Sequence, residues 1–211
     1  DCISPNHVAH EIADNVMPAK ANFRKSKTFV LAIAAGALIA FGAQVSLNVM
    51  TGSEAVSWGF AKLIGAMTFA TGLMMVVLTG AELFTGNVMM TFSVIEKKTS
   101  LAKLLRNWTI VYTGNFVGSI LLAAIIYFTG CSHNSHEALG VLGLTTAYTK
   151  VNLTFVEAFT RGILCNWLVC LAIWMASSSR HVIGKIFAIF FPITTFVASG
   201  YDHSIANMYF I

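Results

Sequence analysis

Five apolar stretches separated by short polar segments dominate the pattern of the chain. A helix that crosses a bilayer needs roughly 20 predominantly apolar residues. The stretches near residues 29–50, 108–128 and 155–176 reach that length without interruption, whereas those that begin near residues 63 and 186 are each interrupted. The pattern therefore predicts an all-α membrane protein in which the second and fifth spans are broken helices.

Both interruptions combine glycine, an acidic residue and small polar residues. The first reads GAELFTGN (80–87) and the second SGYDHSIAN (199–207), so each contains a Gly-x-acid sequence. Three spans separate the N-terminus from the middle loop, and a second set of three therefore lies inverted in the bilayer. Broken helices at matching positions of inverted repeats are the best sequence indication of a site at the bilayer midplane. We accordingly expect two inverted three-helix repeats, the second completed by a sixth span that is missing from this chain.

The two breaks point to a function. A backbone group without a hydrogen-bond partner costs several kcal/mol in hydrocarbon, so a broken helix persists only inside protein or along a water-filled cavity. Facing breaks present helix N-terminal dipoles to an anion or carbonyl oxygens to a cation. The structural alternative is a kink that merely packs against its neighbours. Because each break also carries an ionisable residue, and charges inside a membrane are functional by default, we favour a pore.

Five polar side chains are candidates for the chemistry of the breaks. His203 titrates near neutral pH, which suits proton exchange or contact with an anion; the alternative is a neutral histidine bonded to the backbone. Glu82 and Asp202 are expected to be structural, accepting the backbone N–H groups that the breaks set free. Thr85 donates or accepts at the first break, and Asn166 either reaches the site or joins two helices. A structural role is also expected for the glycines of the breaks: Gly80, Gly86 and Gly200.

The charge pattern excludes several classes of protein. Only 10% of the residues are charged, against about 25% in soluble domains. The net charge of +4 does not indicate a nucleic-acid partner, because lysine and arginine in a membrane protein mark its cytoplasmic loops. These residues precede the first, third and fifth spans, which predicts a cytoplasmic N-terminus. Glu157 and Arg161 are spaced for a local ion pair. The four cysteines form no CxxC motif, and no disulfide framework, metal site or cofactor is expected.

The segment before the first span has a pattern of its own. Val8, Ile12 and Val16 follow a Ser-Pro helix start at intervals of four residues. This spacing predicts a short amphipathic helix on the cytoplasmic surface of the membrane. We therefore divide the chain into a cytoplasmic segment, residues 1–27, and a transmembrane domain, residues 28–211.

Several long motifs resemble the signatures of the formate/nitrite transporter family. They are GAELFTG (80–86), GILCNWLVCLAIWM (162–175) and VASGYDHSIANM (197–208), supported by KANF (20–23), AKLIG (61–65) and NWTIVYTGNFVGS (107–119). The resemblance implies a homopentamer of aquaporin-like protomers in the inner (plasma) membrane, each protomer with its own pore for small monovalent anions. Small residues in the first span also permit the close helix packing that such an assembly needs: Gly36, Ala40, Gly42 and Ala43.

The resemblance also implies roles for individual residues. Leu83, Phe84 and Thr85 belong to the loop between the halves of the second helix. Apolar constrictions are expected at Phe69, Leu73 and Phe196. His203 corresponds to the central pore histidine, and Lys150 to a lysine that attracts anions into the outer vestibule.

These roles imply a non-enzymatic channel or transporter for nitrite, formate or hydrosulfide. A bare anion pays a large desolvation cost at an apolar constriction, whereas proton uptake yields a neutral weak acid, and His203 supplies or stabilises that proton directly or through water. The runs ELFTG and LCNWLVCLAIWMA resemble the nitrite and hydrosulfide branches more than the formate channels. The alternatives are an aquaporin-like channel for neutral solutes and a membrane redox subunit with histidine and methionine haem ligands.

Overall fold

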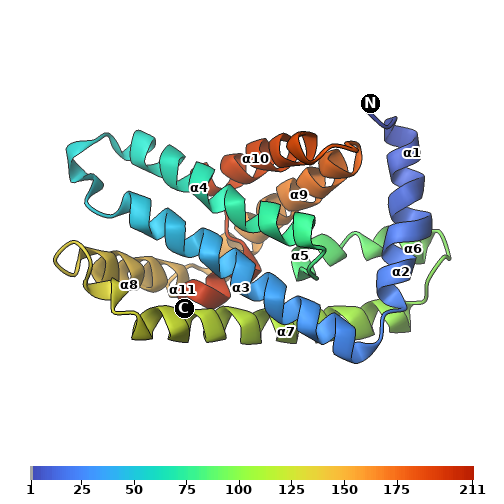
Figure 1. Cartoon of the computed structure of the whole chain (residues 1–211), viewed down its shortest axis with the longest axis horizontal. Coiled ribbons are helices and arrows are strands. Elements are labelled where there is room, and N and C mark those ends of the chain that lie inside the picture. Colours follow the sequence, from blue (N-terminus) through green and yellow to red (C-terminus); the bar gives the residue numbers. More distant parts are fainter. Residues whose placement is uncertain (1) are drawn as a thin grey trace.

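The computed structural model describes residues 2–211, with the side chain of Glu54 left out, and it is entirely helical apart from one isolated β-bridge. Five long helices run along the long axis of the molecule, and the N-terminal helices cross one end of them (Figure 1). The long helices are α3 (Lys25–Met50), α4 (Trp58–Thr79), α7 (Leu101–Phe128), α9 (Phe155–Ser177) and α10 (Val182–Ala198). The shorter elements are α1 (Pro5–His10), η1 (Glu11–Val16), α2 (Met17–Ala21), η2 (Ser53–Ala55), α5 (Phe84–Asn87), α6 (Met90–Ile95), η3 (Cys131–His133), α8 (Ala138–Val151) and α11 (Ser204–Phe210).

The predicted spans are confirmed. The helices α3, α4, α7 and α9 are each long and apolar enough to cross a membrane, and α10 is a shorter apolar helix. Large apolar side chains such as Phe116 and Ile120 on α7 and Trp167 on α9 face outward. An outward-facing apolar surface suits a lipid environment, so the helices that were predicted from hydrophobicity have the exposure of membrane spans.

Small residues bring α4 and α7 close to α3. A Cβ atom on Gly42 of α3 would lie 2.7 Å from the carbonyl oxygen of Phe69 in α4, and one on Gly36 would clash with the backbone of Asn115 in α7. Ala40 and Ala43 are fully buried in the same helix. These small residues therefore serve packing inside the protomer, and they give no support to the expected assembly.

The two predicted breaks have matching backbones. After α4 the chain turns at Gly80, with φ of 71°, and after α10 it turns at Gly200, with φ of 78°. Three residues later Leu83 and His203 are extended, with φ/ψ of −106°/127° and −92°/118°. The next residue in each case begins a short helix, α5 or α11. The internal repeat that the Gly-x-acid sequences predicted is thus present in the backbone.

The N-terminal helices pack their apolar face on the protein. Val8 and Ile12 are buried in a cluster with Met90 and Leu104. The predicted spacing fails at Val16, because residues 11–16 form a π-helical turn in which the N–H of Met17 bonds the carbonyl five residues back. A π turn adds one residue to the repeat, so Met17 takes the buried position expected for Val16.

The helix α8 was not predicted. Its threonine hydroxyls at positions 145, 146 and 149 donate to carbonyl groups one turn earlier, so these polar side chains are satisfied within the helix. The segment between α7 and α9 therefore contains a helix whose last turn includes Lys150.

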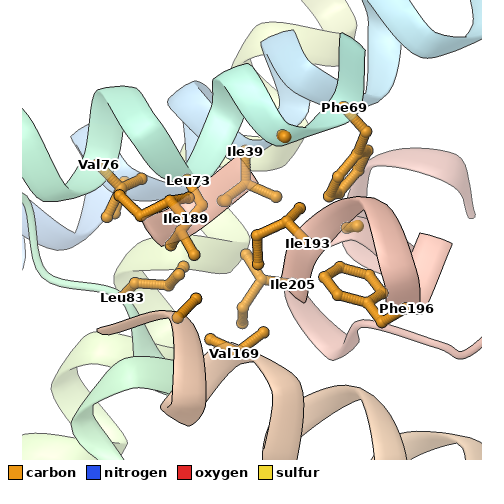
Figure 2. Close-up of a cluster of buried hydrophobic side chains, with 14 of the residues drawn as sticks. Ile39, Phe69, Leu73, Val76, Leu83, Val169, Ile189, Ile193, Phe196 and Ile205 are labelled. Carbon is orange, nitrogen blue, oxygen red and sulfur yellow. The ribbon is translucent and has the colours of Figure 1, made fainter. Parts of the chain in front are cut away.

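The apolar core lies between the long helices and the two breaks (Figure 2). Ile39 of α3, Val169 of α9, Ile193 of α10 and Ile205 of α11 meet there, and all are at most 1% exposed. This core fixes the positions of both breaks, because residues of each break belong to it.

Candidate functional site at the two helix breaks

The two breaks meet at a hydrogen bond between Thr85 and His203. Thr85 lies in α5, just after the first break, and His203 is the N-cap residue of α11, just after the second. Thr85 Oγ1 and His203 Nε2 are 3.0 Å apart, and both residues are buried. The fold thus joins two candidate residues that are 118 positions apart in the sequence.

The second ring nitrogen of His203 determines which nitrogen carries the proton. His203 Nδ1 accepts a hydrogen bond of 3.1 Å from the backbone N–H of Ala206 and so caps α11. A nitrogen that accepts carries no proton, so the proton of the neutral ring is on Nε2. The Nε2–H group then donates to Thr85 Oγ1, which leaves the hydroxyl proton of Thr85 to be donated elsewhere.

Apolar side chains border the imidazole of His203. The ring of Phe196 stacks on it with centroids 5.9 Å apart, and Phe69 meets Phe196 edge-on at 5.8 Å. Leu73 and Leu83 lie in the same apolar cluster and are each 2% exposed (Figure 2). These four predicted residues form an apolar lining beside the polar pair.

Two further predicted residues lie at the edge of this arrangement. The ring of Phe84 packs edge-on against Trp108 and Tyr112 of α7, at 5.8 and 5.1 Å. Asn166 lines, together with Thr85 and His203 among others, a cavity of about 330 Å³. Its amide Nδ2 donates to Cys170 Sγ in its own helix, at 3.6 Å. Asn166 therefore faces the site from α9.

A cavity of about 280 Å³, which we call the vestibule, opens on another side of His203. Its lining includes Phe69, Phe196 and His203 and also three cationic residues from three different helices, Lys62, Lys150 and Arg161. Lys62 precedes Phe69 by about two turns of α4. The vestibule therefore places positive charges beside the apolar rings that border His203.

Lys150, which the resemblance assigned to anion attraction, is held in an ion pair. Its Nζ lies 2.5 Å from Asp202 Oδ1, and its side chain is only 18% exposed. Asp202 Oδ2 also lies 3.5 Å from Arg161 Nη1, and Asn207 Nδ2 donates to Asp202 Oδ1 at 3.4 Å. We expected Asp202 to accept hydrogen bonds from backbone N–H groups, and this expectation is wrong. The carboxylate instead binds the side chains of Lys150, Arg161 and Asn207.

Glu82 has the same kind of partners at the first break. Its buried carboxylate lies 2.9 Å from Lys20 Nζ and accepts from Asn87 Nδ2 at 2.7 Å. The same Asn87 group also donates to Asn107 Oδ1 at 2.9 Å. Lys20 belongs to α2, so this network ties the N-terminal helices to the break.

The two acid–lysine pairs belong to a longer repeat. Lys20 and Lys150 are each followed two positions later by an asparagine, Asn22 or Asn152. Each asparagine amide donates to the carbonyl four residues earlier at 2.8 Å, just before the next span begins. The repeated unit is thus a short helix with a terminal lysine, a span, and a broken span whose acid binds that lysine.

Asn115 of α7 stabilises the first break and was not predicted from the sequence. Asn115 is fully buried, and its Nδ2 donates to the carbonyl groups of Ala32 and Glu82, at 2.8 and 2.9 Å. Its Oδ1 accepts the backbone N–H of Phe84 at 2.9 Å. The available signal was an amide in the middle of an apolar span, where a polar side chain needs partners.

Lys62 and Arg161 were also missed as parts of the site. Arg161 was expected to pair with Glu157, but Glu157 forms a capping box with Thr154 at the start of α9. Arg161 is therefore able to reach Asp202. The available signal for Lys62 was its position near the start of an apolar span, where a charged residue is unusual.

Comparison with known proteins identifies the wider group. The sequence profile described as formate/nitrite transporter matches residues 7–211. The chain is 40% identical to the formate channel FocA of Haemophilus influenzae, over 96% of this chain and 72% of the relative. It is 38% identical to the formate channel FocA of Escherichia coli K12, over 100% of this chain and 74% of the relative. These relatives are named formate channels, so the expected closeness to nitrite or hydrosulfide branches finds no support.

Two solved structures are similar to the fold. A pentameric formate channel with formate bound superposes with a TM-score of 0.80 at 38% identity, covering 88% of this chain and 72% of that one. An FNT family ion channel superposes with a TM-score of 0.88 at 28% identity, covering 97% and 81%. The chain is a multi-pass membrane protein with a channel fold. Because the family profile covers nearly its whole length and the relatives are this similar, the chain belongs to the formate/nitrite transporter family.

Proposed function

We propose that the chain forms a pore through which small monovalent anions cross the membrane together with a proton, with formate as the first candidate. The observation that carries the proposal is the buried Thr85–His203 hydrogen bond, which lies where the two helix breaks meet. The choice of formate is supported by the names of the relatives and by the bound ligand of a solved relative. Nitrite and hydrosulfide remain candidates because they share the small size, the single charge and a weak conjugate acid.

Attraction is the first step. The vestibule holds three cationic side chains, Lys62, Lys150 and Arg161, and one carboxylate, Asp202, so these four groups carry a net charge of +2. A cleft with charges of one sign raises the local concentration of the opposite ion. An anion is therefore drawn toward the rings of Phe69 and Phe196.

Neutralisation is the second step. Between apolar rings an unpaired charge pays a large desolvation cost, which a proton on the anion removes. The hydroxyl of Thr85, oriented by the Nε2–H group of His203, donates a hydrogen bond to the permeating species. A proton on His203 Nδ1 would break the cap to Ala206, so we assign the permeant proton to water in the vestibule and a donor-orienting role to His203.

Three wider features belong to the same proposal. The protein forms a homopentamer, which is supported by the description of a solved relative as pentameric. Its N-terminus lies in the cytoplasm, because lysine and arginine gather in the loops of that side. Residues 1–27 form a cytoplasmic segment and residues 28–211 the pore domain.

The test is uptake into liposomes that contain the purified protein, measured for formate, nitrite, hydrosulfide and glycerol across a range of external pH. Formate uptake should rise as the external pH falls, because protons become more available in the vestibule while the formate gradient is held constant. Uptake of glycerol without uptake of any anion would instead establish a neutral-solute channel. An absorbance spectrum with a haem band would favour the redox alternative.

A further inference from the structure

The cations of the vestibule are not equivalent, because they differ in what compensates their charge. Lys150 lies in contact with Asp202 at 2.5 Å and also over the ring of Phe210, 5.3 Å from its centroid. A lysine and a carboxylate in contact form a pair with little net charge seen from a distance. The attraction of an anion from solution must then come from the other cations.

We propose that Lys62 and Arg161, rather than Lys150, form the site that binds the anion as it enters; this rests on the function proposed above. Lys62 makes no ion pair with any side chain that the structure describes. Arg161 Nη1 lies 3.5 Å from Asp202 Oδ2, and the side chain of Arg161 is 39% exposed. Both line the vestibule, and their charges are available to a ligand.

The two side chains approach the vestibule from different helices. Lys62 lies in the second turn of α4, and Arg161 lies in the second turn of α9. Phe69, Phe196 and His203 line the same cavity, so an anion bound by the two cations is already in the cavity that borders the constriction. A site in this position acts on the supply of anion to the pore and not on the proton step.

The chemistry of the two groups predicts a preference among anions. A guanidinium group is planar and matches two oxygens of a carboxylate at once, whereas an ammonium group acts as a point charge. Formate and nitrite each present two oxygens, and hydrosulfide presents one sulfur. Arg161 should therefore favour the two-oxygen anions, while Lys62 should act on all three alike.

The experiment compares initial uptake of formate and of hydrosulfide by wild type, Lys62→Gln, Arg161→Gln and Arg161→Lys. We expect each glutamine variant to lower formate uptake about two- to five-fold at about 10 mM ionic strength. The difference between each variant and wild type should shrink above about 0.5 M salt, because dissolved ions then screen a charge within a few ångströms. Arg161→Lys should lower formate uptake more than hydrosulfide uptake, because lysine keeps the positive charge but lacks the planar guanidinium group that matches two oxygens.

Matched variants make each outcome informative. Lys185→Gln removes a cation from α10 outside the vestibule and should behave as wild type, and Lys62→Arg should restore the uptake that Lys62→Gln loses. Uptake by Lys62→Gln and Arg161→Gln equal to that of Lys185→Gln at low salt would overturn the proposed site. Absence of anion uptake by wild type would overturn the proposed function instead.

Discussion

At the scale of single residues, His203 performs two tasks with its two ring nitrogens. One accepts the backbone N–H of Ala206 at the start of α11, and the other faces Thr85 across the junction of the breaks. Phe196 covers one face of the ring. The imidazole is thus held by a backbone bond, a side-chain bond and a stacked ring, so its orientation is fixed before any ligand arrives.

We predict that His203→Asn lowers formate uptake at every external pH while the protein still folds, because the hydroxyl of Thr85 is no longer oriented. Asparagine is a good N-cap residue, so it can keep the bond to the first turn of α11, but it does not reproduce the donor at Thr85. The measurement is uptake at several external pH values, normalised to folded protein. The control is His133→Asn, which changes an exposed histidine in η3. Uptake by His203→Asn equal to that of wild type at every pH would leave His203 with the capping role alone.

The sequence was sufficient to select Thr85 and His203 but not to show how they interact. A histidine beside a Gly-x-acid break is a local feature, whereas its hydrogen bond to Thr85 requires both breaks to meet in space. The partners of Asp202 and Arg161 could not be predicted for the same reason: the i, i+4 spacing favoured Glu157, and only tertiary packing brings Asp202 within reach.

At the scale of elements, the two breaks are a repeated backbone device. Each ends a helix at a glycine with positive φ and resumes it after an extended residue. Hydrophobic pattern and glycine position were enough to predict this repeat. They did not reveal α8, because its threonines satisfy their hydroxyls within the helix and so resemble a polar loop in sequence. The π turn at residues 11–16 likewise altered a correctly recognised amphipathic pattern.

We predict that Gly80→Ala and Gly200→Ala each lower the free energy of unfolding by about 1–2 kcal/mol, the cost of a left-handed backbone for a residue with a Cβ atom. No heavy atom lies within 4 Å of a Cβ built on either glycine, so the cost is one of backbone conformation. Gly59→Ala is the control, because that site is equally open but has no positive φ. The measurement is the unfolding of the purified protein in detergent. Destabilisation no greater than that of Gly59→Ala would contradict the prediction.

At the scale of the whole molecule, the interior helix contacts use small residues, whereas the outer surface carries large apolar side chains. The small residues of α3 lie at contacts with α4 and α7 inside the protomer. Large apolar side chains such as Phe155, Phe159 and Trp167 of α9 remain on the surface. Hydrophobicity alone does not separate a face that meets lipid from one that meets another protomer, which is why the sequence could not locate an interface.

We predict that the purified protein in mild detergent contains five chains per particle. Burial of outward apolar faces between protomers would remove them from the detergent, and a solved relative is described as pentameric. Light scattering combined with size-exclusion chromatography gives the number of chains directly. A particle with one chain that still takes up formate after reconstitution would show that the pore needs no neighbouring protomer.

The double duty of His203 has a consequence for how such a pore can change over time. A substitution at this position disturbs a helix terminus and the polar centre in one step, so we expect most mutations other than to a good N-cap residue to impair folding as well as transport. Adaptation to a different anion is easier through residues with a single duty, such as the rings of Phe69 and Phe196 or the cations of the vestibule. Laboratory evolution toward a new substrate should therefore accumulate its changes around the histidine and leave the histidine in place.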